Sequence, residues 1–224
     1  MNILIFGPPG SGKSTHSRRI VERYGLTYIS SGDLIRREIE RGTPIGKEME
    51  AYLSRGELIP DTIVNTLIIS KLKRQRRDFI IDGYPRTPAQ VLALEEFLYD
   101  HGIDIDLALE IFITEDECVE RISGRLICPN CGAVYHVRYN PPRKPGVCDV
   151  CGSELVRRED DSPEVIRKRY RTYIANMEPI IKFYRKKGRY VRVDGDGGIE
   201  DVWKRIQPLL DYIRARESLS RGRP

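Results

Sequence analysis

The first fifteen residues constrain the fold more than any other part of the chain. An apolar run at residues 2–6 predicts a strand, and a helical pattern begins near residue 13. Between them lies Gly7-Pro8-Pro9-Gly10-Ser11-Gly12-Lys13-Ser14, which matches the pattern G-x-x-x-x-G-K-[ST]. Glycines in such a loop let backbone N–H groups point inward, and the helix N-terminus adds positive charge for phosphate oxygens. The segment therefore predicts an α/β fold that binds a nucleoside triphosphate.

Each part of this loop has an expected role. Gly10, Ser11 and Gly12 supply backbone amides, and Lys13 places a positive charge on the β- and γ-phosphates. Ser14 or Thr15 offers a hydroxyl to Mg²⁺ or to its water shell, and the sequence leaves open which of the two does so.

Apolar strands alternate with helices along the rest of the chain, which predicts a doubly wound, five-stranded parallel sheet. The expected strands are 2–6, 27–30, 78–82, 106–113 and 189–193, and the expected helices are 13–24, 32–41, 44–54, 61–75, 88–100, 115–124, 162–187 and 199–216. Two stretches interrupt the alternation, one purely helical and one rich in turns and cysteines. We expect a core of residues 1–30, 61–125 and 162–217, inserts at 31–60 and 126–161, and a disordered tail at 218–224.

Four cysteines in the second insert have the spacing of a metal site. Cys128 and Cys131 form one C-x₂-C pair, Cys148 and Cys151 form another, and a glycine follows each pair. This spacing is typical of a tetrahedral four-cysteine zinc site, which leaves no position for water and is structural. Two disulfides are the alternative, which a reducing compartment disfavours. Cys118 stands alone on an apolar helix face, where we expect it to be buried.

Composition narrows the class of protein. Lys and Arg number 38 and Asp and Glu 33, so the net charge is +5, but the cations are spread along the chain among the acids. That distribution favours small phosphate ligands over a nucleic-acid-binding face. No apolar run approaches the ~20 residues needed to span a bilayer, and the first residues do not have the pattern of a signal peptide. We expect a cytoplasmic protein with no membrane partner.

Several further motifs appear in a recognisable order. Asp82-Gly83-Tyr84-Pro85-Arg86-Thr87 closely resembles the D-G-[FY]-P-R-T signature of adenylate kinases and related nucleoside monophosphate kinases. Similar resemblances are carried by Ser31-Gly32-Asp33-Leu34-Ile35-Arg36, Arg121-Ile122-Ser123-Gly124-Arg125, Tyr135-His136, and Arg158-Glu159-Asp160-Asp161 with Arg169. Together with the phosphate loop they cover about residues 1–211.

The resemblance implies a core, a helical AMP-binding insert at 31–60 and a mobile lid that carries zinc at 126–161. It implies that ATP contacts Gly10, Ser11, Gly12, Lys13, Ser14, Thr15, Arg125, Val134, Tyr135 and Gly197. It implies that AMP contacts Ser31, Arg36, Glu57, Leu58, Ile59, Gly83, Tyr84, Pro85, Arg86, Gln90, Arg158 and Arg169. The residues that act on the transferring phosphoryl group would be Lys13, Arg86, Arg121, Arg125, Arg158 and Arg169. The implied partners are ATP, AMP and ADP, the implied cofactors are Mg²⁺ and structural Zn²⁺, and the implied state is a monomer.

Physical chemistry supports the same roles. Phosphoryl transfer requires in-line positioning and positive charge more than covalent chemistry by the protein. Arginine suits this task because its planar fork binds phosphate bidentately and stays charged. Asp82, at the end of a predicted buried strand, would orient Mg²⁺ through water.

Two departures and two alternatives remain. The resembled family usually has glycine where Ser14 stands, and many members have threonine where Ser31 stands. The first alternative is a kinase for UMP, CMP or GMP, which shares these motifs. The second is a nucleic-acid-binding ATPase with a zinc ribbon, although the sequence lacks helicase-type motifs and a row of stacking aromatics.

Overall fold

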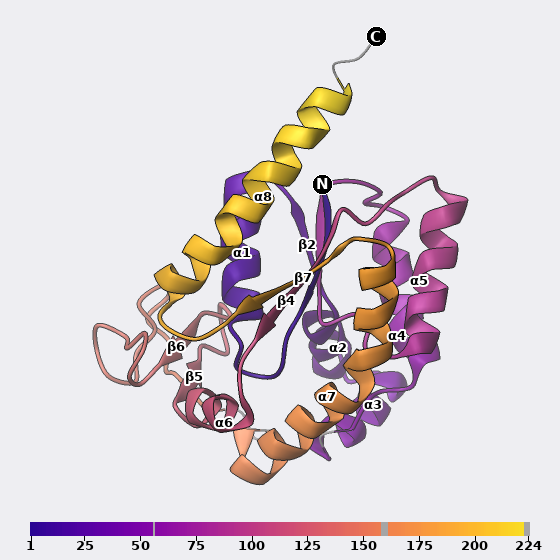
Figure 1. Cartoon of the computed structure of the whole chain (residues 1–224). Coiled ribbons are helices and arrows are strands. Elements are labelled where there is room, and N and C mark those ends of the chain that lie inside the picture. The colour runs from indigo at the N-terminus through magenta and orange to yellow at the C-terminus, as the bar shows by residue number, and fades with distance from the viewer. Residues whose placement is uncertain (56, 158–160, 222–224) are drawn as a thin grey trace.

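The computed structural model describes residues 1–55, 57–157 and 161–221, with side chains as far as residue 217. A five-stranded parallel sheet forms its centre, in the order β2-β3-β1-β4-β7 (Figure 1). These strands are β1 (Asn2–Phe6), β2 (Thr27–Ser30), β3 (Phe79–Asp82), β4 (Leu107–Phe112) and β7 (Tyr190–Asp194). The predicted doubly wound sheet and its five strands are confirmed.

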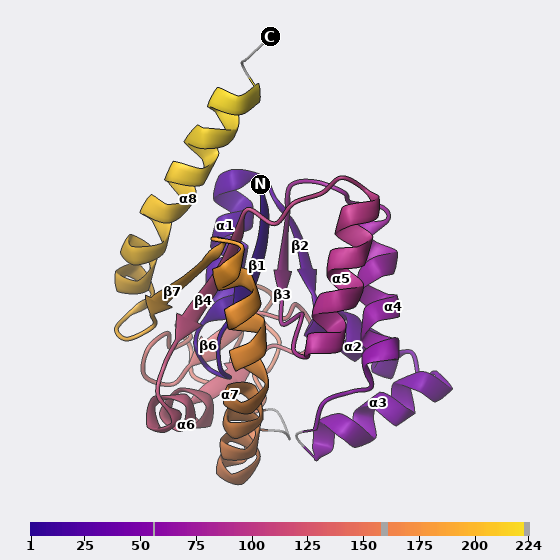
Figure 2. The same cartoon turned by 45° about the vertical axis from the view of Figure 1, so that its right-hand side comes forward.

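Helices cover both faces of the sheet because successive strand residues point to opposite sides. Ile3 and Ile5 face one core, where α1 (Lys13–Tyr24) and α8 (Ile199–Arg221) pack. Leu4 and Phe6 face the other, where α4 (Asp61–Leu72), α5 (Pro88–Asp100) and α7 (Pro163–Lys186) pack. Figure 2 shows α1 and α8 on one side of the strands and α4 and α5 on the other. This layering leaves the carboxyl ends of the strands open for ligands.

The first insert contributes α2 (Ser31–Glu40) and α3 (Pro44–Ser54). Each helix begins at a hydroxyl residue that accepts a backbone hydrogen bond, Ser30 from Asp33 N at 3.1 Å and Thr43 from Gly46 N at 3.0 Å. α3 projects away from the sheet, as Figure 2 shows. The insert therefore forms one wall beside the strand ends.

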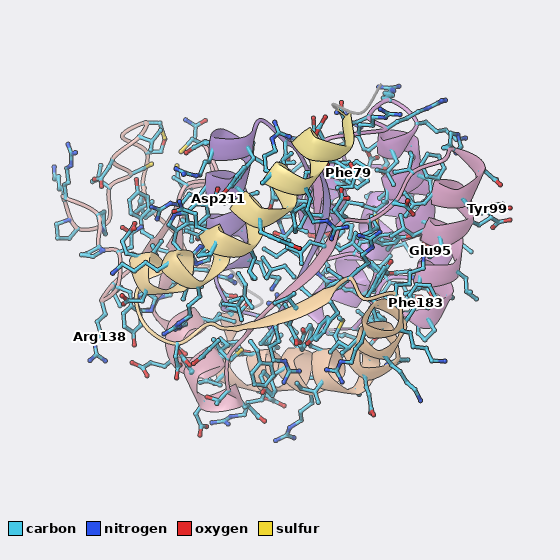
Figure 3. All side chains as sticks on the ribbon, turned by 45° about the horizontal axis from the view of Figure 1, so that its top comes forward. Phe79, Glu95, Tyr99, Arg138, Phe183 and Asp211 are labelled. Carbon is cyan, nitrogen blue, oxygen red and sulfur yellow. The ribbon has the colours of Figure 1, made fainter. Side chains whose placement is uncertain are left out.

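The second insert follows α6 (Glu115–Ser123) and includes a small antiparallel sheet of β5 (Arg125–Ile127) and β6 (Val134–His136). It lies to the side of the main sheet, near α6 (Figure 1). Arg138 (labelled in Figure 3) and Tyr139 both donate hydrogen bonds from this insert to Glu120 Oε1 of α6. The turn-rich sequence of 126–157 thus contains this two-stranded sheet, which was not predicted.

The C-terminal helix is longer than predicted. α8 runs to Arg221, whereas the sequence pattern placed its end at 216 and a disordered tail from 218. The apolar periodicity stops near residue 213, but no glycine or proline follows that point until Gly222. The rest of the predicted tail, 222–224, lies outside the described residues. Among the described helices, none has the length and apolar character needed to cross a membrane.

A buried carboxylate ties α7 to the sheet. Glu110 of β4 is 1% exposed and accepts hydrogen bonds from Tyr173 OH of α7 at 2.5 Å, from Tyr190 OH and from Arg192 Nε at 2.6 Å. Just after the end of α7, Lys187 pairs with Glu95 of α5, and its Nζ lies 5.1 Å from the ring centroid of Phe183; Figure 3 labels Glu95 and Phe183. Because α7 also carries Arg169, Glu110 helps to position one side of the site.

We expect Glu110→Ala to lower the free energy of unfolding by about 3 kcal/mol, because it leaves buried donors without their acceptor. Denaturant unfolding followed by circular dichroism measures this. Glu96→Ala, at an exposed position of α5, is the control and should change stability by less than ~0.5 kcal/mol. Equal stability of the two variants would contradict the role of Glu110.

Candidate active site

The phosphate loop runs from β1 into α1 along a tightly constrained path. A Cβ at Gly7 would lie 2.2 Å from Ile111 O, so only glycine fits there. Gly12 has φ 83° and precedes the first residue of α1, Lys13. The loop is thus built as predicted, with the N-terminus of α1 aimed across the ends of the strands.

Lys13 reaches back over its own loop. Its Nζ donates to Gly7 O at 2.7 Å and to Pro8 O at 2.9 Å. Burial lowers the pKa of Lys13 to about 8, Asp82 opposes that shift, and the positive charges of Arg86 and Arg169 add to it. Three predicted catalytic cations, Lys13, Arg86 and Arg169, therefore face one space near the Asp82 carboxylate.

Arg86 lies in that space next to Gly83. Its Nε donates to Gly83 O at 2.7 Å, and its side chain keeps contact with solvent at the cleft although many protein atoms surround the guanidinium group. Desolvation and the charges of Arg169 and Arg36 lower its pKa, while Asp82 opposes them. A Cβ at Gly83 would lie 2.8 Å from both Ser31 Oγ and Arg86 Nη2. Glycine at this position lets the arginine lie close to the strand ends.

Asp82 forms the acidic centre of the site. It ends β3, is 5% exposed, and accepts hydrogen bonds at Oδ2 from Ser14 Oγ and from Tyr28 OH, both at 2.7 Å. Burial raises the pKa of Tyr28, so its phenol remains a donor. Thr15 is exposed, with no hydrogen bond from its side chain to the described residues. Of the two candidate hydroxyls, only Ser14 contacts the acid.

A small pocket lies between the helical insert and the core. Its lining includes most of the residues that the resemblance assigns to AMP, namely Ser31, Glu57, Leu58, Ile59, Gly83, Arg86 and Gln90. It also includes Ile35, Leu53 and Val64, which sequence reasoning did not select. These three belong to the apolar faces of helices, so the sequence marks them only as core residues.

Gln90 and Tyr84 form hydrogen bonds that hold the residues around the pocket in place. Gln90 Oε1 accepts from Arg86 N, and Gln90 Nε2 donates to Asp61 Oδ1, both at 2.7 Å. Tyr84 is fully buried, and its OH donates to Asn65 Oδ1 at 2.8 Å. The side chains of Tyr84 and of the buried Pro85 thus belong to the core rather than to the pocket. Asp61, which the sequence did not single out, fixes Gln90.

The arginines around the cleft are held by acidic side chains. Arg36 pairs with Asp33, and Arg125 donates to Asp161, with its Nε 3.0 Å from Oδ2. Arg169 Nη1 lies 3.9 Å from the same Asp161. Arg158 lies outside the described residues. The chain just before the second insert and the helix that follows it are therefore joined through Asp161.

Arg121 contacts the loop after β7. Its Nη2 donates to Gly195 O at 2.9 Å and to Gly197 O at 3.4 Å, and it also pairs with Glu117. Burial and the neighbouring Asp196 raise the pKa of Glu117 to about 7. Arg121, predicted to act on the transferring phosphoryl group, and Gly197, predicted to contact ATP, are thus brought together.

The lid residues predicted to contact ATP point in different directions because side chains alternate along β6. Val134 is 37% exposed, whereas Tyr135 is 6% exposed. Tyr135 OH accepts from Asp149 N at 2.8 Å and lies 3.5 Å from Cys148 Sγ. The Tyr135 side chain therefore lies within the small core of the lid.

The four predicted ligand cysteines converge in that core. Their sulfur atoms all lie within 4.8 Å of one another, with Cys128 and Cys151 3.3 Å apart and Cys131 and Cys148 3.5 Å apart. A tetrahedral ion with Zn–S bonds of ~2.3 Å requires sulfurs roughly 3.8 Å apart, so the set fits zinc. Cys118 is fully buried elsewhere, as predicted, and all five cysteines are free thiols.

Together, the phosphate loop, the converging cations and the two inserts define a P-loop protein that binds nucleotides for phosphoryl transfer. The sequence profile of the family "Adenylate kinase" matches residues 5–189. The chain belongs to the adenylate kinase family.

The chain is also similar in sequence to curated adenylate kinases over nearly their whole length. The adenylate kinase of Thermococcus kodakarensis is 79% identical over 217 residues, 97% of this chain and 97% of the relative. That of Pyrococcus furiosus is 72% identical over 219 residues, 98% of this chain and 100% of the relative. That of Archaeoglobus fulgidus is 45% identical over 217 residues, 96% of this chain and 100% of the relative.

Proposed function

We propose that the protein transfers a phosphoryl group reversibly between Mg-ATP and AMP, giving two ADP, and so balances adenine nucleotides. The single observation that carries this is the meeting of Lys13, Arg86 and Arg169 between the phosphate loop and the insert pocket. ATP lies with its phosphates on the loop, and AMP lies in the pocket lined by Ser31, Glu57 and Gln90. The transferring group is then surrounded by positive charge.

The cations act on charge that spreads over the phosphoryl oxygens. Arg36 and Arg86 hold the AMP phosphate, while Lys13 neutralises the β- and γ-phosphates of ATP. Arg121, Arg125, Arg158 and Arg169 complete the positive enclosure when the lid closes. Their acidic partners, such as Asp33 for Arg36 and Asp161 for Arg125, hold the side chains in place until phosphates replace these partners.

Both metal ions have fitting donors. Ser14 Oγ and the Asp82 carboxylate are the hard oxygen groups that Mg²⁺ prefers, and Mg²⁺ bound with ATP supplies charge neutralisation on the phosphates. The four lid cysteines hold zinc in a closed structural set. The lid is too small to build a large core, so the metal keeps it rigid. We further propose that the protein works as a monomer without a nucleic-acid partner.

A coupled assay with a panel of nucleoside monophosphates tests the specificity. With Mg-ATP as donor, AMP should be phosphorylated at least tenfold more efficiently in kcat/KM than CMP, UMP or GMP, as roughly expected when polar groups match one base edge. Omission of Mg²⁺ should abolish the rate. A clear preference for CMP or UMP would replace this proposal with the related monophosphate kinases.

A further inference from the structure

The hydroxyl of Tyr28 lies at the acidic centre of the site without being part of any nucleotide-binding motif. Tyr28 is in β2, where it pairs in register with Ile80, two residues before Asp82 on the adjacent strand. Side chains two apart on a strand share a face, so Ile80 and Asp82 point toward α1. The Tyr28 ring packs against that core and extends along the sheet to reach Asp82.

Two hydroxyls converge on one oxygen of Asp82. Ser14 Oγ and Tyr28 OH each donate to Oδ2 at 2.7 Å. The other oxygen, Oδ1, accepts no hydrogen bond from the described residues. It is not fully buried, so it is in contact with solvent. The carboxylate is therefore fixed with one oxygen held by the protein and the other open to the cleft.

The different environments of the two oxygens matter because χ2 of an aspartate has a broad, nearly two-fold distribution, so the carboxylate can rotate unless contacts hold it. With a single donor from the exposed Ser14, the carboxylate could rotate. Tyr28 approaches from the sheet, is half-buried, and donates from a fixed direction. Its phenol can remain in place even when Ser14 uses its lone pairs for a metal ion.

We propose that Tyr28 is a positioning residue that orients Asp82 toward Mg²⁺ bound with the nucleotide at the phosphate loop. This inference rests on the proposed function for the identity of the nucleotide. It goes beyond that function because it names a residue that raises the affinity for Mg²⁺ at the phosphate loop. Tyr28 does not contact the nucleotide itself; it acts through Asp82 alone.

Tyr28→Phe removes only the hydroxyl and is the decisive variant. Calorimetric titration with a non-hydrolysable ATP analogue, with and without Mg²⁺, separates the two contributions. The gain in affinity due to Mg²⁺ should fall about tenfold, the size expected for loss of a hydrogen bond to a charged group. Binding of the metal-free analogue should stay within twofold of wild type. The Mg²⁺ concentration for half-maximal rate should rise by a similar factor, with the KM for AMP unchanged.

The chain offers a matched control in Tyr24→Phe. Tyr24 packs against the same core and donates to Asp211 Oδ1 at 2.6 Å, but this pair lies away from the site on α1 and α8. Tyr24→Phe should leave the Mg²⁺ effect unchanged. In an Asp82→Asn background, Tyr28→Phe should have no further effect on the Mg²⁺-dependent affinity.

Three results would overturn the inference. The first is a Mg²⁺ effect in Tyr28→Phe equal to that of wild type. The second is an equal loss of metal-free binding, which would show that Tyr28 supports the phosphate loop as a whole. The third is a full effect of Tyr28→Phe in the Asp82→Asn background. These results concern nucleotide binding, so they are distinguishable from a failure of wild-type protein to phosphorylate AMP.

Discussion

Arg86→Ala should lower kcat/KM for AMP by about 10³-fold, with the fold intact. The magnitude follows from the loss of one charged donor that acts mainly on developing charge, for which factors of about 10²–10⁵ are typical. Lys13→Ala should lower the rate by a similar factor, because Lys13 faces the same space. Steady-state kinetics with separately varied ATP and AMP measure both effects.

The two variants should differ in which substrate they affect. Arg86 lines the proposed AMP pocket, so Arg86→Ala should weaken the binding of AMP far more than the binding of ATP. Arg86→Lys keeps the positive charge but loses the planar guanidinium that binds phosphate bidentately, so we expect a rate between those of wild type and Arg86→Ala. Arg37→Ala, at an exposed position of α2, is the control and should retain nearly the full rate. Near-wild-type kinetics for Arg86→Ala or Lys13→Ala would refute the assigned role.

The second large effect concerns the lid. Cys148→Ala should remove one zinc per chain, lower the melting temperature and make residues 126–157 sensitive to protease. Four thiolates around zinc contribute roughly 10–16 kcal/mol in isolated peptides, and here much of that free energy orders a segment with a very small core. Limited trypsin digestion at the exposed Arg138 and Arg143, with elemental analysis, measures the change.

Catalysis should survive in part, because Lys13 and Arg86 lie outside the lid, although Arg125 would be held less firmly. Cys118→Ala is the control, since that cysteine lies on the buried face of α6, away from the cluster, and its loss should leave the zinc content unchanged. Wild-type protein without zinc would remove the proposal. Abolished activity with a protease-resistant lid would instead indicate a catalytic metal, contrary to a closed set of four cysteines.

Local patterns were sufficient for much of the fold. The strand at 27–30 and the helices at 13–24, 44–54 and 88–100 have the predicted ends, because apolar periodicity and capping residues lie next to one another in the chain. The end of α8 was misplaced because helix propensity continues past the last apolar contact. The pairing of β5 with β6 was missed because such short strands depend on the cysteine cluster beside them.

Sequence patterns were enough to predict the phosphate loop, the cysteine spacing and the order of the arginine motifs, since each is a short pattern whose chemistry is local. The folded structure was needed to show which side chains face one another. It placed Tyr135 in the lid core, Tyr84 beneath the pocket and Tyr28 on Asp82. These positions depend on strand register and on helix packing between segments far apart in the chain. Contacts of that kind leave no periodic signal in the sequence, because any buried tyrosine in a strand or turn satisfies the same pattern.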